Sequence, residues 1–384
     1  MGELYRQGWR PRRTIVYAAW DGEEPGLIGS TEWVEAHREE LERKAVAYLN
    51  TDSNGRGYLD LAGSHTLEQF LNEVARDVTD PETGLSVWKR RQLAQIRTGE
   101  PDARKEARTR RDLRLDALGS GSDFTPFLQH AGIPTLNLGF WGEDGGGIYH
   151  SIYDDFRWYT SFSDTSFVYG KALAQTVGLA VMRLASAELL PHEFTALADA
   201  ASKYTGELEK LRDTQAEEAE ERARQLDEGL FRATDDPRSP TREPARLPVP
   251  PHFTFTPLRN ALDSLTRSAA RYDRAYAAAL ASGTAFRAAA DSVNPRLRAS
   301  ERALMSPDGL PKRPWFRHLL YAPGYYTGYG VKTLPAAREA IEQRQYADVD
   351  PQLARIAKAL AAEAKLAAEA AAALEKATGK VAGR

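Results

Sequence analysis

The chain has 384 residues, 42% hydrophobic and 9% aromatic, which is enough for one large domain or two ordinary ones with a packed core. Its 54 acidic and 51 basic residues leave a net charge of −3, so charge gives no case for nucleic acid or a membrane surface as the main partner. It contains no cysteine, which excludes disulfides and thiolate metal sites and leaves His, Asp and Glu as the metal ligands.

The N-terminal half alternates strand and helix patterns, which predicts an α/β fold with a mostly parallel sheet covered by helices on both faces. Residues 13–20 (RTIVYAAW) are β-branched and aromatic and end at an acidic turn, as expected of a buried strand. The next elements are expected at residues 30–43 (a helix capped by Ser30), 44–51 (strand), 66–79 (helix), 124–130 (short helix) and 135–139 (strand).

Residues 87–114 interrupt this alternation because they carry many Lys and Arg residues against few acids. A solvated insertion or loop is the expected structure, and the alternative is a basic rim that attracts substrate.

Targeting and membrane signals are weak. No apolar run of the signal-peptide type follows the basic start, so the sequence leaves the compartment open. The longest apolar stretch, residues 167–190, contains Lys171 and Arg183 and predicts a buried or amphipathic helix, not a membrane span.

After residue 190 the strand patterns stop. Residues 192–227 are a charged helical segment, residues 235–251 form a linker rich in Pro and charge, and residues 258–291 and 350–378 are long Ala-rich helical patterns. We therefore expect an α/β domain over residues 1–190 and an all-α domain over residues 191–384.

Four short motifs carry side chains or backbone suited to chemistry, and each also has an ordinary structural explanation. Asp21, Glu23 and Glu24 follow the first predicted strand, where one carboxylate can bind a metal while the other takes a proton from water. Asp52 follows the second strand and could equally be a turn residue. The other two motifs are Gly119-Ser120-Gly121-Ser122-Asp123, which could bind an oxygen through free N–H groups or cap a helix, and Gly145-Gly146-Gly147-Ile148-Tyr149-His150, whose glycines let backbone approach a ligand beside an imidazole.

In order, these motifs resemble the metallopeptidases with two co-catalytic zinc ions, and specifically the branch of glutamate carboxypeptidase II and the transferrin receptor. The resemblance rests on RRTIVYAAWDGEEPGLIGSTEW, VAYLNTDS, LGSGSDFTPFLQHAGIP and IYHSIYDDF, and it continues through PDGLPKRPWFRHLLYAP at residues 307–323. It implies a dimerisation domain in the C-terminal helices, and hence a homodimer.

The resemblance also implies roles for individual residues. Glu23 would be the general base, and Tyr149 would hydrogen-bond the oxyanion. Glu24 and His150 would hold one zinc ion and Asp52 the other. The remaining implied residues are Ser120, Gly121, Ser122 and Tyr329 along the substrate site, and Asp21 and Asp123 behind the metal ligands.

The chain departs from this family pattern in its metal ligands. The family has one further His ligand and a bridging Asp upstream of the Glu-Glu pair, but none of the 22 residues before Glu23 is His. We therefore expect a truncated part of the enzyme that is inactive by itself, since catalytic zinc ordinarily has three protein ligands.

The residues expected to determine substrate specificity also differ from the family pattern. No Arg or Lys lies between Ile133 and His150, and Gly328 stands before Tyr329 where glutamate-cleaving relatives have lysine. A peptide substrate cleaved by a carboxypeptidase or dipeptidase-like exopeptidase is expected. The alternative is a non-catalytic receptor or scaffold of the transferrin receptor type.

Overall fold

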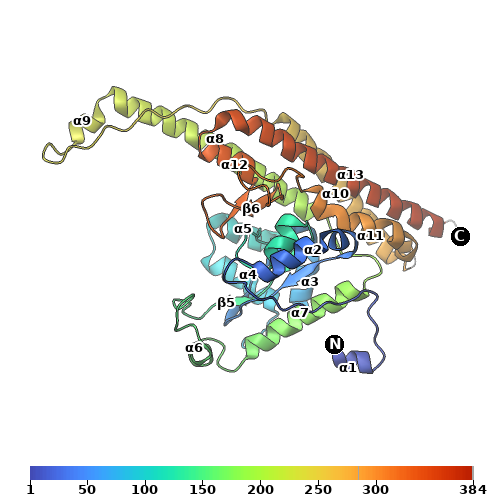
Figure 1. Ribbon diagram of the computed structural model, residues 1–384. Helices are drawn as coiled ribbons and strands as arrows, with labels where there is room; N and C mark the ends of the chain where they lie inside the picture. Colours follow the sequence, from blue (N-terminus) through green and yellow to red (C-terminus); the bar gives the residue numbers. More distant parts are fainter. Residues whose placement is uncertain (284, 383–384) are drawn as a thin grey trace.

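The computed structural model describes residues 1–283 and 285–382 as an α/β half followed by a helical half (Figure 1). This confirms the predicted α/β part followed by a helical part, whereas most of the described strand pairs are antiparallel where a mostly parallel sheet was expected. Most of the strands, which are all short, belong to the α/β half. They are β1 (Tyr48–Asn50), β2 (Gly57–Leu59), β3 (Ala62–Gly63), β4 (Thr135–Asn137), β5 (Phe140–Gly142), β6 (Tyr321–Pro323) and β7 (Val331–Thr333).

The sheet nearest the candidate site has the strand order β1-β4-β3. Strands β1 and β4 are parallel, with Tyr48 opposite Thr135 and Asn50 opposite Asn137, whereas β3 runs antiparallel to β4. The pairs β2–β5 and β6–β7 are also antiparallel. Because β1 and β4 run the same way, the loops that follow them leave from the same edge, which is where ligands collect in such sheets.

Helices pack around these strands through their apolar faces. Phe70, Leu71 and Val74 of α3 belong to one cluster of buried side chains together with Phe140 and Tyr169. The helical elements of this half are α1 (Gly2–Arg6), α2 (Ile28–Lys44), η1 (His65–Leu67), α3 (Glu68–Asp77), α4 (Val87–Thr98), α5 (Pro101–Thr109), η2 (Pro126–His130), α6 (Phe156–Phe162) and α7 (Val168–Ser186).

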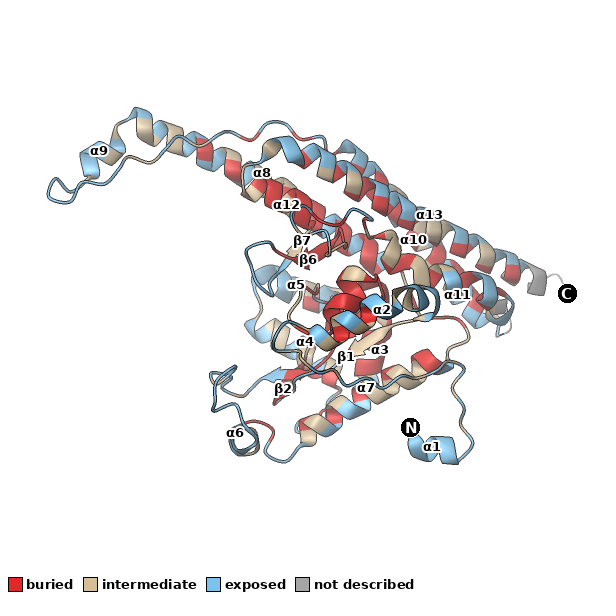
Figure 2. Ribbon diagram, in the orientation of Figure 1, coloured by how far each residue is buried: buried red, intermediate tan, exposed pale blue. Residues whose placement is uncertain are grey.

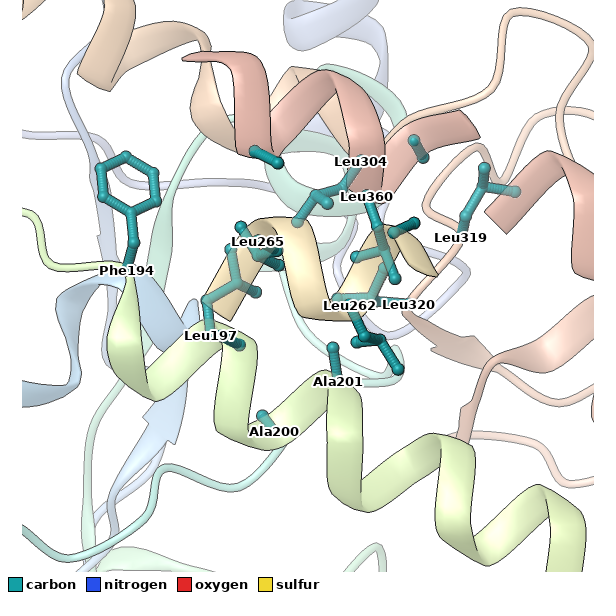
Figure 3. Close-up of a cluster of buried hydrophobic side chains, with 14 of the residues drawn as sticks. Phe194, Leu197, Ala200, Ala201, Leu262, Leu265, Leu304, Leu319, Leu320 and Leu360 are labelled. Carbon is teal, nitrogen blue, oxygen red and sulfur yellow. The ribbon is translucent and has the colours of Figure 1, made fainter. Parts of the chain in front are cut away.

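The helical half contains a larger core, in which α10 and α13 run side by side along much of their length (Figure 1). Leu197 of α8, Leu265 of α10 and Leu360 of α13 meet there and are almost fully buried (Figure 3). Each such leucine contributes about 1.5–3 kcal/mol through removal of apolar surface from water. The elements are α8 (Thr195–Asp227), α9 (Leu230–Thr234), α10 (Thr256–Ala281), α11 (Ala285–Ala303), α12 (Pro335–Glu342), η3 (Tyr346–Asp348) and α13 (Val349–Ala382).

Residues 235–251 contain no helix or strand, which confirms the predicted linker. This linker returns from α9, which lies at the tip of an arm that extends away from the rest of the molecule (Figure 1). In the part of the chain that the structure describes, no helix is both long and apolar enough to cross a bilayer.

The prediction of a buried strand at residues 13–20 is wrong. The segment is extended but belongs to no sheet, and Val16 and Tyr17 are 71% and 75% exposed. A strand needs a neighbour for its N–H and C=O groups, and none of the described strands pairs with residues 14–20. The apolar pattern therefore remains in solvent (Figure 2).

The prediction of a solvated insertion or loop at residues 87–114 is also wrong, because this segment forms helices α4 and α5. Several of its basic side chains are paired with acids: Arg90 contacts Asp80 at 2.8 Å, and Arg110 contacts Glu68 at 2.6 Å. The acidic partners come partly from distant segments, so the local excess of basic residues did not reveal the pairing.

Two helix boundaries differ from expectation. Ser30 does not cap α2. The helix begins at Ile28 after Leu27, whose φ is 58°, and the Ser30 hydroxyl donates back to the Leu27 carbonyl at 3.3 Å. The pattern over residues 258–291 is two helices, since α10 ends at Ala281 and is followed by Gly283 with φ of 70°.

Candidate functional site

The turn that carries Glu23 and Glu24 wraps around the start of α2. The N–H of Leu27 donates to the Glu23 carbonyl at 2.7 Å, and the N–H of Gly29 donates to the Asp21 carbonyl at 3.1 Å. A Cβ at Gly29 would overlap Asp21 Oδ1, so glycine permits this close approach. Asp21 thus fixes the turn against the helix.

Glu24 and His150 meet directly, although they are far apart in the sequence. His150 Nε2 lies 3.3 Å from Glu24 Oε2. The backbone at His150 is left-handed, with φ of 59°, and its ring stacks on that of Tyr149 with 3.8 Å between centroids. The glycine-rich loop therefore places the His150 imidazole beside the Glu24 carboxylate.

Asp52 and Asp123 also act electrostatically on the Glu23 carboxylate. The pKa of Glu23 is raised, first by burial and then by the charges of Glu24, Asp123 and Asp52, while His150 lowers it. Burial and the charge of Asp52 likewise raise the pKa of Asp123, against a hydrogen bond from Ser30. Acidic side chains from the Glu-Glu turn, the end of β1 and the glycine-serine loop thus share one electrostatic region.

The loop of Ser120, Gly121 and Ser122 is closed over by Tyr329, from the connection between β6 and β7. The N–H of Ser120 donates to the Tyr329 carbonyl at 3.3 Å. Gly121 has φ of 99°, and a Cβ there would lie 2.8 Å from the Tyr329 ring. The helical half therefore contributes a tyrosine to this side of the site.

Tyr149 lies near the same carboxylates. Its pKa is raised by burial first and then by Tyr329, Glu24, Glu23 and Asp52. Its phenol is 63% exposed, so it can reach a molecule that enters from solvent.

The donor chemistry of these residues suits zinc, which accepts carboxylate oxygen and imidazole nitrogen. Their arrangement does not complete a site: over residues 1–283 and 285–382, no three His, Cys, Asp or Glu side chains are grouped as metal ligands. Glu24 with His150 is a pair, and Asp52 stands apart from it as a separate donor.

Sequence reasoning missed a set of neutral polar residues beneath the site. Tyr48 and Asn50 lie on β1 two residues apart, and Asn50 bonds to Ser122 and Asn137. The available signal was the strand period, because alternate residues such as 48 and 50 face the same side of a strand.

Comparison with known proteins gives two family matches and several relatives. Residues 1–166 match the family described as Peptidase family M28, and residues 253–367 match the transferrin receptor-like dimerisation domain. The chain is 31% identical over 369 residues to a probable glutamate carboxypeptidase, LAMP1, of Arabidopsis thaliana, covering 94% of the chain and 46% of the relative.

Two further relatives agree. A probable glutamate carboxypeptidase of Zea mays, VP8, is 33% identical over 349 residues, which is 89% of the chain and 41% of the relative. The aminopeptidase NAALADL1 of Mus musculus is 24% identical over 378 residues, 94% of the chain and 45% of the relative. The chain spans less than half the length of each of these relatives.

Proposed function

The chain belongs to the branch of peptidase family M28 that carries a transferrin receptor-like dimerisation domain, and on this premise we propose that it supplies catalytic residues to a metal-dependent exopeptidase. The observation that carries the proposal is the contact of His150 Nε2 with Glu24 Oε2 at 3.3 Å. The charges of Glu24, His150 and Asp52 all act on the neighbouring Glu23 carboxylate. An imidazole and several carboxylates around one space are the groups that metal-assisted peptide hydrolysis requires.

Each residue has a role in this proposal. Glu23, partly shielded from water among other carboxylates, is the general base. Tyr149 hydrogen-bonds the oxygen that becomes negative during attack. Glu24 and His150 are ligands of one zinc ion, and Asp52 is a ligand of a second. Ser120, Gly121, Ser122 and Tyr329 border the substrate, with Asp21 and Asp123 behind the ligands.

We infer that the chain on its own is inactive, because the described residues bring together only a pair of ligands and a separate carboxylate. A catalytic zinc ion, which supplies Lewis-acid chemistry, is ordinarily held by three protein ligands. The His and bridging Asp of the family pattern are not among residues 1–22.

The substrate is proposed to be a peptide with no demand for a terminal glutamate. Residues 134–149 contain no Arg or Lys, and Gly328 precedes Tyr329, so a guanidinium or ammonium clamp for a side-chain carboxylate is lacking there. The relatives are named both carboxypeptidases and aminopeptidases, so the proposal stops at exopeptidase.

The helical half, which we place at residues 191–384, is proposed to mediate a homodimer. The dimerisation-domain match covers residues 253–367, and these include all of α10 and more than half of α13. The α/β half is placed at residues 1–190.

A second candidate is a non-catalytic receptor or scaffold. It is favoured by one observation, that no three-ligand group exists among the described residues. Against it stands the joint presence of Glu23, Glu24, Asp52 and His150 in one region, for which a scaffold has no chemical need.

A peptide hydrolysis assay distinguishes the exopeptidase from the non-catalytic receptor or scaffold. The purified chain is assayed on unblocked peptides with zinc, alone and together with the part of the Arabidopsis relative that the chain does not match. We expect turnover only in the combination, and its loss in Glu23→Gln. Turnover unaffected by Glu23→Gln would overturn the assignment, and turnover by the chain alone would overturn the inferred inactivity.

A further inference from the structure

A chain of neutral hydrogen bonds runs beneath the candidate site. Trp20 Nε1 donates to the Tyr48 hydroxyl at 3.1 Å, and that hydroxyl donates to Asn50 Oδ1 at 3.0 Å. Asn50 Nδ2 then donates to Ser122 Oγ at 2.8 Å and to Asn137 Oδ1 at 2.9 Å. The residue just before the Asp21–Glu24 turn is thereby linked through β1 to the glycine-serine loop and to β4.

The bonds of this network have one consistent set of directions in the structure. The Trp20 indole nitrogen can only donate, so the Tyr48 oxygen accepts from it, and the Tyr48 hydroxyl in turn donates to Asn50 Oδ1. With Oδ1 directed toward Tyr48, both hydrogens of the Asn50 amide nitrogen are used, one toward Ser122 and one toward Asn137. Ser122 Oγ must therefore accept.

The Ser122 hydroxyl keeps its own hydrogen as a result. Among the residues that the structure describes, Ser122 Oγ donates to no acceptor. Ser122 lies between Gly121 and Asp123 in the loop that borders the site, so a ligand oxygen that reached this mostly buried hydroxyl would meet an unused hydrogen.

The network is held in a dry environment. Asn50 and Ser122 are each only 4% exposed. Tyr48 stacks on Phe127 with 3.9 Å between ring centroids, and burial raises the pKa of Tyr48 to about 12, so the phenol keeps its proton. A polar group left without a partner here would be costly.

We propose that Asn50 is a positioning residue, which fixes the loop of residues 119–122 on the ends of β1 and β4 and presents the Ser122 hydroxyl as a donor to a carbonyl or carboxylate oxygen. The proposal rests on the proposed function only in taking that oxygen to belong to a peptide.

Amide hydrogen exchange of the full chain, read over residues 119–123 by mass spectrometry, tests the positioning. Asn50→Ala is expected to speed exchange there by about ten-fold or more, because the loop loses a buried donor. The matched control is Asn72→Ala. Asn72 is fully buried and accepts from Trp88 Nε1 at 2.6 Å, but it holds Leu113 and not the site loop. The control is expected to leave residues 119–123 unchanged.

A milder variant guards against loss of folding. Tyr48→Phe removes one hydroxyl, and it is expected to shift the Trp20 indole N–H resonance and to loosen the same loop. Unchanged exchange at residues 119–123 in both Asn50→Ala and Tyr48→Phe, or an equal increase in Asn72→Ala, would overturn the positioning role.

The donor role is tested with N-acetyl-alanyl-alanine as the probe, followed by amide shifts of residues 119–123. Asn50→Asp has no hydrogens to donate, so Ser122 must turn its own toward residue 50. We expect a saturable shift in the wild-type chain and its loss in Asn50→Asp. No shift in the wild type, or equal shifts in both, contradicts the donor role. Neither readout requires zinc or hydrolysis, so each outcome is independent of the peptidase assay.

Discussion

The helical half of the molecule buries its large apolar side chains almost completely, whereas the face around the candidate site leaves many in solvent. Leu265 and Leu360 have no exposed surface, but Ile152 is 87% exposed and Phe156 73%. Figure 2 shows the contrast, with buried stripes along α10 and α13 and an exposed α6.

The two regions also differ in what specifies them. A helix of the bundle presents its apolar residues at spacings of three and four, so nearby sequence decides which face is buried. The site residues lie on turns, and their positions depend on contacts such as Glu24 with His150 and Ser120 with Tyr329. The helical half is thus held by a continuous core, and the site by a few polar contacts.

The largest effect should come from a core truncation in the helical half. Leu265→Ala is expected to lower the free energy of unfolding by about 2–5 kcal/mol, through lost burial and the cavity it leaves. Leu280→Ala is the control on the same helix, because Leu280 is 46% exposed. Urea denaturation measures both, and equal costs would contradict the contrast between buried and exposed positions.

The next effect concerns a buried acid in the same core. Burial raises the pKa of Glu363 to about 8, with the Glu301 charge adding to it and the Ser300 hydroxyl bond opposing it. The raised pKa means that the folded state holds the proton. Its contribution to stability is complete below about pH 4.5, where the unfolded chain is also protonated, and it is lost progressively up to about pH 8.

Glu363→Gln removes that loss, because the amide stays neutral. The variant should therefore gain on the order of 1–3 kcal/mol in the free energy of unfolding at pH 8 and little at pH 4.5. Glu369→Gln, exposed on the same helix, should show no such pH-dependent gain. A pH-independent effect of Glu363→Gln in thermal melts would argue against a buried neutral acid.

A smaller effect is expected at the site loop. Gly121→Ala places a side chain at φ of 99° and against the Tyr329 ring, which should cost about 1–3 kcal/mol. Gly84→Ala shares the positive φ but has open space, so the excess cost at Gly121 measures the Tyr329 contact. If both cost the same in urea denaturation, Tyr329 does not close over the loop as described.

The smallest effect belongs to the exposed face. Val16→Ser and Phe156→Ser should each change the free energy of unfolding by less than about 0.5 kcal/mol, since both side chains are mostly exposed to solvent. Both should reduce self-association in sedimentation velocity, because an exposed apolar patch favours it. A cost comparable to that of Leu265→Ala would show that this face is packed.

The sequence predicted most helices and the arrangement of the motifs, but not the neighbours that complete them. The helices α7, α8 and α13 and the strands β1 and β4 lie where periodicity placed them. The strand at residues 13–20 failed because pairing requires a partner strand that a local pattern cannot supply. The segment 87–114 was misread because some of its acidic partners lie elsewhere in the chain.

For the candidate site, the sequence identified the residues and left their arrangement open. The contact between Glu24 and His150 agrees with the expected convergence, while the roles assigned to Glu23, Asp52 and Tyr149 stay predictions. Asn50 was missed because an amide on a short strand carries no motif. The fold alone brings its two donor hydrogens to Ser122 and Asn137, which are far from it in the sequence.

The most direct test is a zinc titration of the purified chain against a competing chromophoric chelator. We expect weak binding that falls by about ten-fold or more in His150→Ala, since each lost ligand weakens a metal site strongly, and no change in His37→Ala on the exposed side of α2. Binding that is indifferent to His150→Ala, or equally weakened by His37→Ala, would contradict the claim that these residues are part of a metal centre.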